Sequence, residues 1–245
     1  MKPLWRWIGL AALATLLLQL FFVVRIAAMV VIDPQSTAFQ RSEAWRIVNL
    51  KGELPWRQQW VPYAQISDHL KRAVIASEDD SYADHDGVDW DAIEKAWARN
   101  SRAGELAQRR AAAARNAKNP RAPKVIGGST ITQQLAKNLF LSGERTLLRK
   151  GQELVLTLLL ELLLDKQRIL EIYLNNVEWG TGVFGAQAAA EHYFRKPAAR
   201  LSPYEAARLA VMLPRPKYFE KLPQSAYLSD RASTIVARMP HAQLP

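Results

Sequence analysis

The chain has 245 residues, of which 49% are apolar and 23% are charged, and its formal net charge is +10. This length and composition predict one folded domain with an appended segment. The sequence contains no cysteine, which excludes a disulfide framework, thiolate chemistry and a cysteine-based metal site such as a zinc finger.

The N-terminus carries a long apolar run from Ile8 to Ile32, whose one charged side chain is Arg25. About 20 such residues cross a bilayer, and Lys2 and Arg6 precede the run, so the positive-inside rule places the N-terminus in the cytoplasm. A cleaved signal peptide is the alternative, but its apolar region would be only about 7 to 15 residues long. We therefore expect residues 1–33 to form a cytoplasmic tip and a retained transmembrane anchor.

The segment 34–62 contains three tryptophans but shows no sustained helical or alternating period, and we interpret it as a connecting region. Directly after it, Ser67 and Asp68 can cap a helix whose apolar residues share one face. This helix brings Glu78 close to its C-terminal end.

A cluster of acids lies between Glu78 and Asp89, beside His85 and Gly87. The C-terminal end of a helix carries partial negative charge and disfavours carboxylates by up to about 1 kcal/mol, so the cluster has a local cost that a function would explain. It therefore indicates one wall of an active site. A solvated acidic turn is the alternative, and this segment alone favours neither interpretation.

Asp89 itself has a structural explanation as the N-cap of the next helix, where Val88 and Ile93 would form a hydrophobic staple. The glycine two positions earlier is explained in the same way, as a turn residue. Trp90 and Trp97 are expected to share one face of the helix with its other apolar residues.

The segment 100–124 has seven Lys or Arg residues against a single acid, and we describe it as a basic linker. Because the anchor places it outside the cytoplasm, its anionic partner would be a lipid headgroup or a lipid-linked phosphate, and no nucleic acid is expected. The alternative is a mobile, solvated arm.

Paired glycines at 127 and 128 lead into a helix start at which Thr130 and Gln133 form a capping box. Gln134 and Lys137 stand one turn apart on the exposed face of this helix. Backbone amides at such an N-terminus, with a lysine nearby, can hold a phosphate group. The lysine does not follow the glycines at the spacing of a Walker loop, which disfavours nucleotide binding. A capped surface helix is the alternative.

The segment 147–165 is apolar nearly all round and too short to cross a bilayer, so we predict that it forms the buried central helix of the domain. Glu153 lies in its first turns, where the helix dipole favours a carboxylate. Glu161 lies within the apolar run and must find a hydrogen-bonding partner or line a cleft. The later segment 177–185 has a tryptophan, a phenylalanine and three glycines, and we expect a loop that walls a cleft. No segment alternates convincingly as a strand would.

Four stretches together resemble the peptidoglycan glycosyltransferases of family 51, in particular the monofunctional biosynthetic transglycosylases with one membrane anchor. The resemblance extends from about Ile66 to Phe219. It departs from the family pattern at Tyr82, where phenylalanine is usual, and in the longer basic linker. The four stretches are Glu78-Asp79 with His85 and Gly87, Gly128 to Gln134 with Lys137-Asn138, Arg149-Lys150 with Glu153, and Tyr173-Leu174-Asn175 through Gly180.

This resemblance implies a mainly α, lysozyme-like, two-lobed glycosyltransferase domain over residues 63–245, preceded by one transmembrane helix. It also implies a protein of the bacterial inner membrane whose catalytic domain lies in the periplasm. The reaction would polymerise lipid II into glycan strands by forming β-1,4 bonds with inversion, releasing undecaprenyl pyrophosphate. No transpeptidase domain follows in the sequence, so peptide cross-linking is expected from another protein.

The resemblance further implies that Glu78 is the general base, and we expect repulsion from neighbouring acids to raise its pKa. Lys137 and Arg145 would hold the pyrophosphate, with Arg149 and Lys150 in support. These cations would neutralise the charge of the leaving group.

Glu153 is the second catalytic acid that the resemblance implies, either assisting departure of the pyrophosphate or holding a divalent cation, Mg²⁺ or Mn²⁺, against the phosphates. The sequence requires no other cofactor. Gln134 would position the donor sugar or phosphate. The supporting residues implied at the site are Asp79, His85, Ser129, Thr130, Gln133, Asn138, Asn175 and Gly180.

The expected partners are lipid II, the growing lipid-linked glycan strand and membrane lipids, with transpeptidases or other cell-wall synthesis proteins as a further class. A lysozyme-like lytic enzyme is one alternative, because paired carboxylates in a helical cleft also serve glycosidases. A membrane-anchored, non-enzymatic cell-wall scaffold is another. Cations that face the cleft would favour the transferase, since a hydrolase of the polymer has no pyrophosphate to neutralise.

Overall fold

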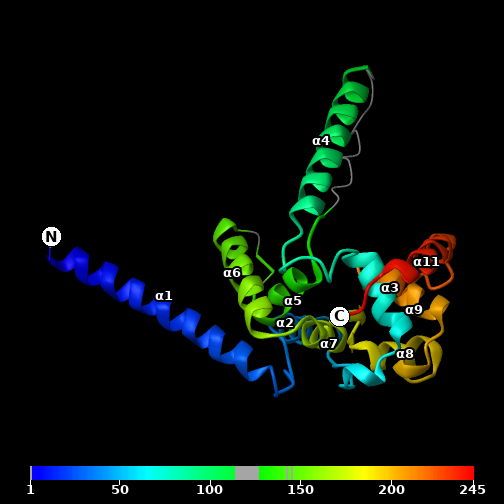
Figure 1. The fold of residues 1–245 in the computed structure, drawn as a ribbon, viewed down its shortest axis with the longest axis horizontal. Helices are drawn as coiled ribbons and strands as arrows, with labels where there is room; N and C mark the ends of the chain where they lie inside the picture. The colour runs from blue at the N-terminus through cyan, green and yellow to red at the C-terminus, as the bar shows by residue number, and fades with distance from the viewer. Residues whose placement is uncertain (1, 114–126, 142, 145) are drawn as a thin grey trace.

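The computed structural model describes residues 2–113, 127–141, 143–144 and 146–245. In these residues the structure is mainly helical, with one small sheet of three short strands in the order β1-β3-β2. A long helix, α1 (Lys2–Ala28), extends away from the body of the molecule, and α4 (Trp90–Ala113) projects from it in another direction (Figure 1). The mainly α fold predicted from the sequence is confirmed.

By length and composition, α1 could cross a membrane over Leu4–Ala28, and it is the one such helix in the part of the chain that the structure describes. Most of its side chains are exposed, but Phe22 and Ile26 in its last turns are buried, as is Met29 directly after it. These three residues belong to the same apolar core as the domain, and Phe22 packs edge-on against Phe140. The end of the apolar helix is therefore part of the folded body.

The segment 34–62 differs from its expected role as a connecting region without a helical period, because it contains helix α2 (Ala38–Lys51). Thr37 and Gln40 form a capping box at its start, and Gly52 ends it in the left-handed conformation, with a φ of 73°. The apolar residues of α2 do not gather on one face, so periodicity does not reveal the helix. The capping box and the glycine were the signals that could have found it.

Helix α3 (Asp68–Glu78) begins at its N-cap Ser67 and ends at the acid cluster, as predicted. It packs against α9 (Pro203–Met212) and α11 (Ala226–Arg238). These helices form one group in the fold, and α9 begins with a capping box between Ser202 and Glu205 and with a proline in its first turn.

Asp89 caps α4 as predicted, since its carboxylate accepts a backbone N–H from the first turn of the helix at 2.7 Å. Trp90 and Trp97 do not lie on a buried face, however, and their side chains are 68% and 77% exposed. The reason is that α4 projects away from the body (Figure 1). Residues 100–113 of the predicted basic linker continue this helix, and residues 114–126 lie outside the described residues.

Helix α6 (Leu147–Leu163) was expected to be the buried central helix, and this prediction is wrong. Leu156 and Leu160 are fully buried, but Leu158 and Leu162 on the other side are 50% and 78% exposed. One side of α6 is covered by α1, α5 and α7, and nothing among the described residues covers the opposite apolar face. Composition alone could not indicate that only one face would find neighbours.

The segment 177–185 was expected to be a loop, but it forms a hairpin of β2 (Glu178–Gly180) and β3 (Val183–Phe184). Strand β1 (Arg57–Gln58) pairs with β3 in parallel on its other side. Trp179 is fully buried in the core instead of facing a cleft. Strands of two or three residues are too short to show alternation, so the sequence pattern could not reveal this sheet.

Helix α7 (Lys166–Asn176) is mostly buried from Ile169 onward and lies between α5 (Ile131–Phe140) and α8 (Ala186–Phe194). It thereby joins the group formed by α2, α5 and α6 to the rest of the fold. The remaining elements are short: α10 at Pro216–Phe219 and 3₁₀ helices at Tyr63–Gln65, Ala198–Arg200 and Met239–His241.

Candidate active site

Glu78 is the last residue of α3, and two other helices hold its carboxylate. Gln134 Nε2 of α5 donates to Glu78 Oε2 at 3.0 Å, and the Tyr173 hydroxyl of α7 donates to Gln134 Oε1 at 3.0 Å. Burial is the largest cause that raises the pKa of Glu78, and the charge of Asp79 adds to it, while hydrogen bonds from Gln134 and Ser77 oppose the shift. The sequence prediction named repulsion between acids as the cause, but the structure puts burial first.

Glu78 lines a pocket of about 470 Å³ between the end of α3, the acidic loop, the start of α4 and the turn before α5, which we call the Glu78 pocket. Lys95 and Arg99 of α4 and Arg238 of α11 line it as well. Arg238 forms an ion pair with Asp80 at 3.0 Å. Sequence reasoning missed these three cations, because the packing of distant helices brings them to the pocket.

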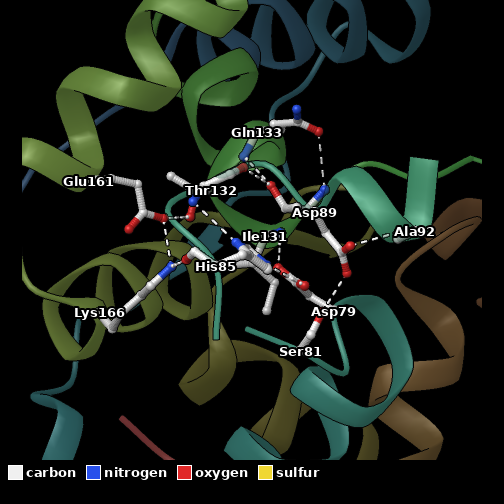
Figure 2. A network of polar contacts seen from close by, with 12 residues as sticks. Asp79, Ser81, His85, Asp89, Ala92, Ile131, Thr132, Gln133, Glu161 and Lys166 are labelled. Atoms are coloured by element: carbon white, nitrogen blue, oxygen red, sulfur yellow. Dashed lines mark hydrogen bonds and ion pairs between the residues drawn. The ribbon is translucent and has the colours of Figure 1, made fainter. Parts of the chain in front are cut away.

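Asp79 is buried beside Glu78 and connects α3 to α5 (Figure 2). Its Oδ2 accepts the N–H of Ile131, the first residue of α5, and its Oδ1 accepts from His85 Nε2, both at 2.9 Å. The Gly87 N–H donates to His85 Nδ1 at 3.1 Å, which leaves Nε2 as the ring nitrogen that donates to Asp79. The dipole of α5 also favours a carboxylate at this helix start. Asp79 and His85 thus hold the end of α3 against the beginning of α5.

The capping box predicted at the start of α5 is present. The backbone N–H of Gln133 donates to Thr130 Oγ1 at 3.1 Å, and the Gln133 side chain accepts the Thr130 N–H at 3.2 Å. Thr130 Oγ1 also donates to the carbonyl of Gly87 at 2.6 Å. The helix cap is therefore a second link between α5 and the acidic loop.

Glu161 finds hydrogen-bonding partners, as its position in an apolar run predicts. Its Oε1 accepts from Thr132 Oγ1 at 2.6 Å and from Lys166 Nζ at 2.9 Å (Figure 2). Lys166 Nζ also donates to the carbonyl of His85 at 2.6 Å. This partly buried network fixes the acidic loop to α6 and α7.

A second pocket of about 490 Å³ lies between α2, α5 and α6, and we call it the Glu153 pocket. Helix α5 contributes four polar residues whose roles were predicted, and α6 contributes Glu153 with its neighbouring cations. Helix α2 contributes Phe39, Ser42 and Glu43, which sequence reasoning missed together with the helix itself. The predicted lining residues from α5 and α6 are Gln133, Gln134, Lys137, Asn138, Arg149, Lys150 and Glu153.

Cations surround Glu153 in this pocket. Arg149 Nη1 donates to Glu153 Oε2 at 2.9 Å, and Lys150 Nζ bonds the other carboxylate oxygen. Lys137 remains accessible to solvent, but the pocket walls partly desolvate its ammonium group and lower its pKa. The charges of Arg149 and Lys150 lower this pKa further, whereas the charge of Glu153 raises it. The Nε of Arg149 is buried and has no hydrogen-bond partner among the described residues. Three cations from two helices therefore converge on one space.

The two pockets are neighbours, since Ser129 lines both of them and Gln134 lines one while bonding Glu78 in the other. Besides His85, two of the predicted supporting residues line neither pocket. Asn175 is buried and exchanges two hydrogen bonds of 2.9 Å with the backbone of Val61. Gly180 lies in β2, where an added Cβ would come within 2.8 Å of a tyrosine hydroxyl. Packing explains both residues.

Arg145, which was predicted to hold the pyrophosphate, lies outside the described residues. Its neighbours in sequence lead into α6, whose N-cap Thr146 accepts the N–H of Arg149 at 3.2 Å.

Comparison with known proteins agrees with this geometry. A family model described as Transglycosylase matches residues 48–240. The chain is 54% identical over 244 residues to a biosynthetic peptidoglycan transglycosylase of Burkholderia thailandensis, an alignment that covers 98% of this chain and 88% of that protein. It is 52% identical to a protein of the same name from Burkholderia pseudomallei, with the same coverage. It is 49% identical over 233 residues to one from Herminiimonas arsenicoxydans, covering 95% and 93% of the two chains.

The family resemblance predicted from four short motifs is thus confirmed over far more of the sequence than the motifs occupy. The family model matches most of the chain, and these relatives are about half identical to it along nearly its whole length. The chain therefore belongs to the family of biosynthetic peptidoglycan transglycosylases.

Proposed function

We propose that this peptidoglycan glycosyltransferase joins lipid II to a growing lipid-linked glycan strand, with an acceptor sugar in the Glu78 pocket and a donor pyrophosphate in the Glu153 pocket. The observation that carries the proposal is the pair of neighbouring pockets, one lined by a carboxylate whose pKa is raised and the other by converging cations. A glycosyl transfer from a pyrophosphate needs a base on one side and an anion-binding site on the other.

In the acceptor half, the 4-hydroxyl of the lipid II sugar is the nucleophile. Its proton passes to Glu78 as its oxygen forms a bond to the anomeric carbon of the donor strand. A carboxylate with a raised pKa is a stronger base than an ordinary one, and it stays ionised as long as the pH exceeds that pKa. Attack opposite the leaving group converts the α-linked donor into a β-1,4 product.

In the donor half, the bond between the anomeric carbon and the pyrophosphate oxygen breaks, and its electron pair leaves with undecaprenyl pyrophosphate. Lys137, Arg149 and Lys150 neutralise the developing charge, which such fixed cations do best in a partly desolvated pocket. The unpaired buried Nε of Arg149 supports this role, because it offers a hydrogen bond that no described residue uses. Arg145 is proposed as a further anchor of the pyrophosphate.

Glu153 keeps two of these cations in place, because each of its carboxylate oxygens bonds one of them. Among the described residues, no three His, Asp or Glu side chains gather into a group that could hold a metal ion. Both carboxylate oxygens of Glu153 already bond Arg149 and Lys150. We therefore propose that these two cations, and not Mg²⁺ or Mn²⁺, supply the positive charge at the pyrophosphate.

We further propose that Leu4–Ala28 crosses the cytoplasmic membrane, with the N-terminus in the cytoplasm and the domain on the outer side. Lys2 and Arg6, at the N-terminal end of the helix, support this orientation through the positive-inside rule. The exposed apolar face of α6, which packs beside α1, supports contact between the domain and lipid.

The test is polymerisation of labelled lipid II by the purified full-length protein in detergent. Glu78→Gln should reduce the rate at least about 100-fold, the usual scale for loss of a general base, while leaving thermal stability nearly unchanged. Glu94→Gln, which neutralises an exposed acid on α4 outside both pockets, is the matched control and should polymerise at the normal rate. Normal polymerisation by Glu78→Gln would move the base elsewhere, and release of shortened glycan from sacculi would indicate a lytic enzyme.

A further inference from the structure

We propose that Tyr173 is a positioning residue for the glycosyl transfer, acting through the side-chain amide of Gln134 to fix the carboxylate of Glu78. The three side chains come from α7, α5 and α3 and form a chain of two hydrogen bonds, each 3.0 Å long. The inference rests on the proposed function, in which Glu78 takes the proton of the acceptor hydroxyl.

The chemistry of the three groups permits only one direction for this chain. An ionised carboxylate can only accept hydrogen bonds, so Gln134 must turn its NH₂ group toward Glu78. The amide oxygen then faces Tyr173, whose hydroxyl donates to it. If the amide rotated by half a turn, its oxygen would face the negative carboxylate, and the bond to Glu78 would be replaced by repulsion. The donated hydrogen bond of Tyr173 therefore stabilises the orientation in which the amide NH₂ group meets Glu78.

Tyr173 is suited to this role because its donor state does not change. Its side chain is almost completely buried, and burial raises the pKa of its hydroxyl well above the ordinary value, an effect that the charges of Glu78 and Asp79 increase. The phenol therefore keeps its proton throughout the pH range in which the enzyme works. The neighbouring Asn175, which bonds Val61, holds this part of α7 in place.

This chain also accounts for the position of Gln134 better than a direct role in donor binding. Its amide oxygen and one amide hydrogen are engaged by Tyr173 and Glu78, so it is part of the support of the base. Glu78 in turn is held in an orientation that faces its pocket, and a base fixed within a fraction of an ångström is far more effective than a mobile one.

The chain should influence the pH dependence of the reaction. A hydrogen bond to the ionised form of Glu78 lowers its pKa and opposes burial, so loosening Gln134 should raise that pKa further. Activity requires the ionised form and falls on the acid side, so the acid limb of the rate profile should move to higher pH. Asp79 raises the same pKa, and Lys137 lowers it. The other charged groups that line the Glu78 pocket are Asp80, Asp84, Asp89, Lys95, Arg99 and Arg238.

The experiment is Tyr173→Phe, assayed for lipid II polymerisation across pH in the full-length protein. We expect kcat to fall roughly 10-fold and the acid limb to move up by about one pH unit, with little change in the KM for lipid II. Tyr82→Phe is the matched control, because Tyr82 is also fully buried and its hydroxyl donates to the backbone carbonyl of Lys166 at 2.7 Å, away from Glu78. It should lose similar stability without a shift of the acid limb.

A second pair of variants tests whether Tyr173 acts through Gln134. Gln134→Ala should show the same shift of the acid limb, and adding Tyr173→Phe to it should shift the limb no further. The inference is overturned if Tyr173→Phe behaves as Tyr82→Phe does, or if its shift is undiminished in the Gln134→Ala background. If Glu78→Gln polymerises normally, the proposed base is wrong and this inference fails with it. If Glu78→Gln is impaired but Tyr173→Phe is not, the proposed function stands and only this inference fails.

Discussion

At the scale of single residues, burial raises the pKa of two glutamates with different consequences. Glu78 borders a pocket, so its raised pKa makes it a stronger base toward a bound hydroxyl. Glu178 is buried in β2, and burial raises its pKa to about 7, although Lys217 partly offsets the shift. Lys217 Nζ lies 3.3 Å from Glu178 Oε1, but the two atoms do not have hydrogen-bond geometry. Lys217 donates its hydrogen bond to Glu43. The charge of Glu178 is therefore poorly compensated.

The raised pKa of Glu178 predicts that the stability of the wild-type protein depends on pH, and that Glu178→Gln reduces this dependence. Between about pH 4.5 and pH 7 the folded protein holds a proton on Glu178 that the unfolded chain has lost, so the free energy of unfolding should fall as pH rises through this window. The loss is on the order of 3 kcal/mol at most, and it is complete above the folded pKa. Glu178→Gln removes the titration, so its stability should vary less between pH 5 and pH 8.

Thermal unfolding of both proteins at pH 5 and pH 8 provides the measurement. The exposed Glu94→Gln removes the same charge from the surface and should follow the wild type. Identical pH dependence of Glu178→Gln and wild type would show that Glu178 does not titrate in this window.

At the scale of elements, Gly87 determines how closely the acidic loop approaches α6. Its φ is +83°, and a Cβ at this position would come within 2.7 Å of Glu161 Cγ and 2.8 Å of Thr157 Cγ2. A left-handed conformation costs an L-residue about 1 to 2 kcal/mol, and the collision adds to that. Because the Gly87 carbonyl accepts from Thr130, a displaced loop also disturbs the start of α5.

We therefore expect Gly87→Ala to lower the free energy of unfolding by at least about 1 to 2 kcal/mol and to reduce polymerisation per folded molecule. Gly104→Ala, in the middle of α4, is the control, since nothing lies within 4 Å of its added Cβ. That change should be neutral or stabilise the helix by up to about 1 kcal/mol. Chemical denaturation and lipid II turnover of the two variants check the prediction, which fails if both alanines have the same effect.

At the scale of the whole molecule, the end of the anchor contributes to the stability of the domain. Phe22, Ile26 and Met29 are buried in the common core, and Gln19 Nε2 donates to Gln152 Oε1 on α6 at 2.9 Å. Fully burying a large apolar side chain contributes roughly 1.5 to 3 kcal/mol. Part of α1 is thus a structural element of the enzyme.

Two truncations separate anchoring from this structural contribution. Removal of residues 1–18 keeps every contact named above, so its thermal stability in a given detergent should match that of the full chain. Removal of residues 1–32 uncovers the core beneath α1, and its melting temperature in the same detergent should fall by several degrees. Equal melting temperatures for the two truncated proteins would show that the packing of α1 is energetically unimportant.

Features that depend on neighbours along the chain could be predicted from the sequence. N-caps and capping boxes at Ser67, Asp89, Thr130 and Ser202 mark helix starts that the structure has. The long apolar run marks α1, and the motifs indicated the family that the comparisons confirm. These signals are local because a helix start needs hydrogen bonds that residues a few positions away can supply.

Which faces and side chains meet depends on the tertiary structure. Among the described residues it leaves one apolar face of α6 uncovered, brings α2 to the wall of the Glu153 pocket, and forms a hairpin from strands too short to predict. It also joined Tyr173, Gln134 and Glu78, which lie on three helices and are separated by dozens of residues. A side chain's partners across such distances depend on how whole helices pack, and neither periodicity nor spacing within one element carries that information.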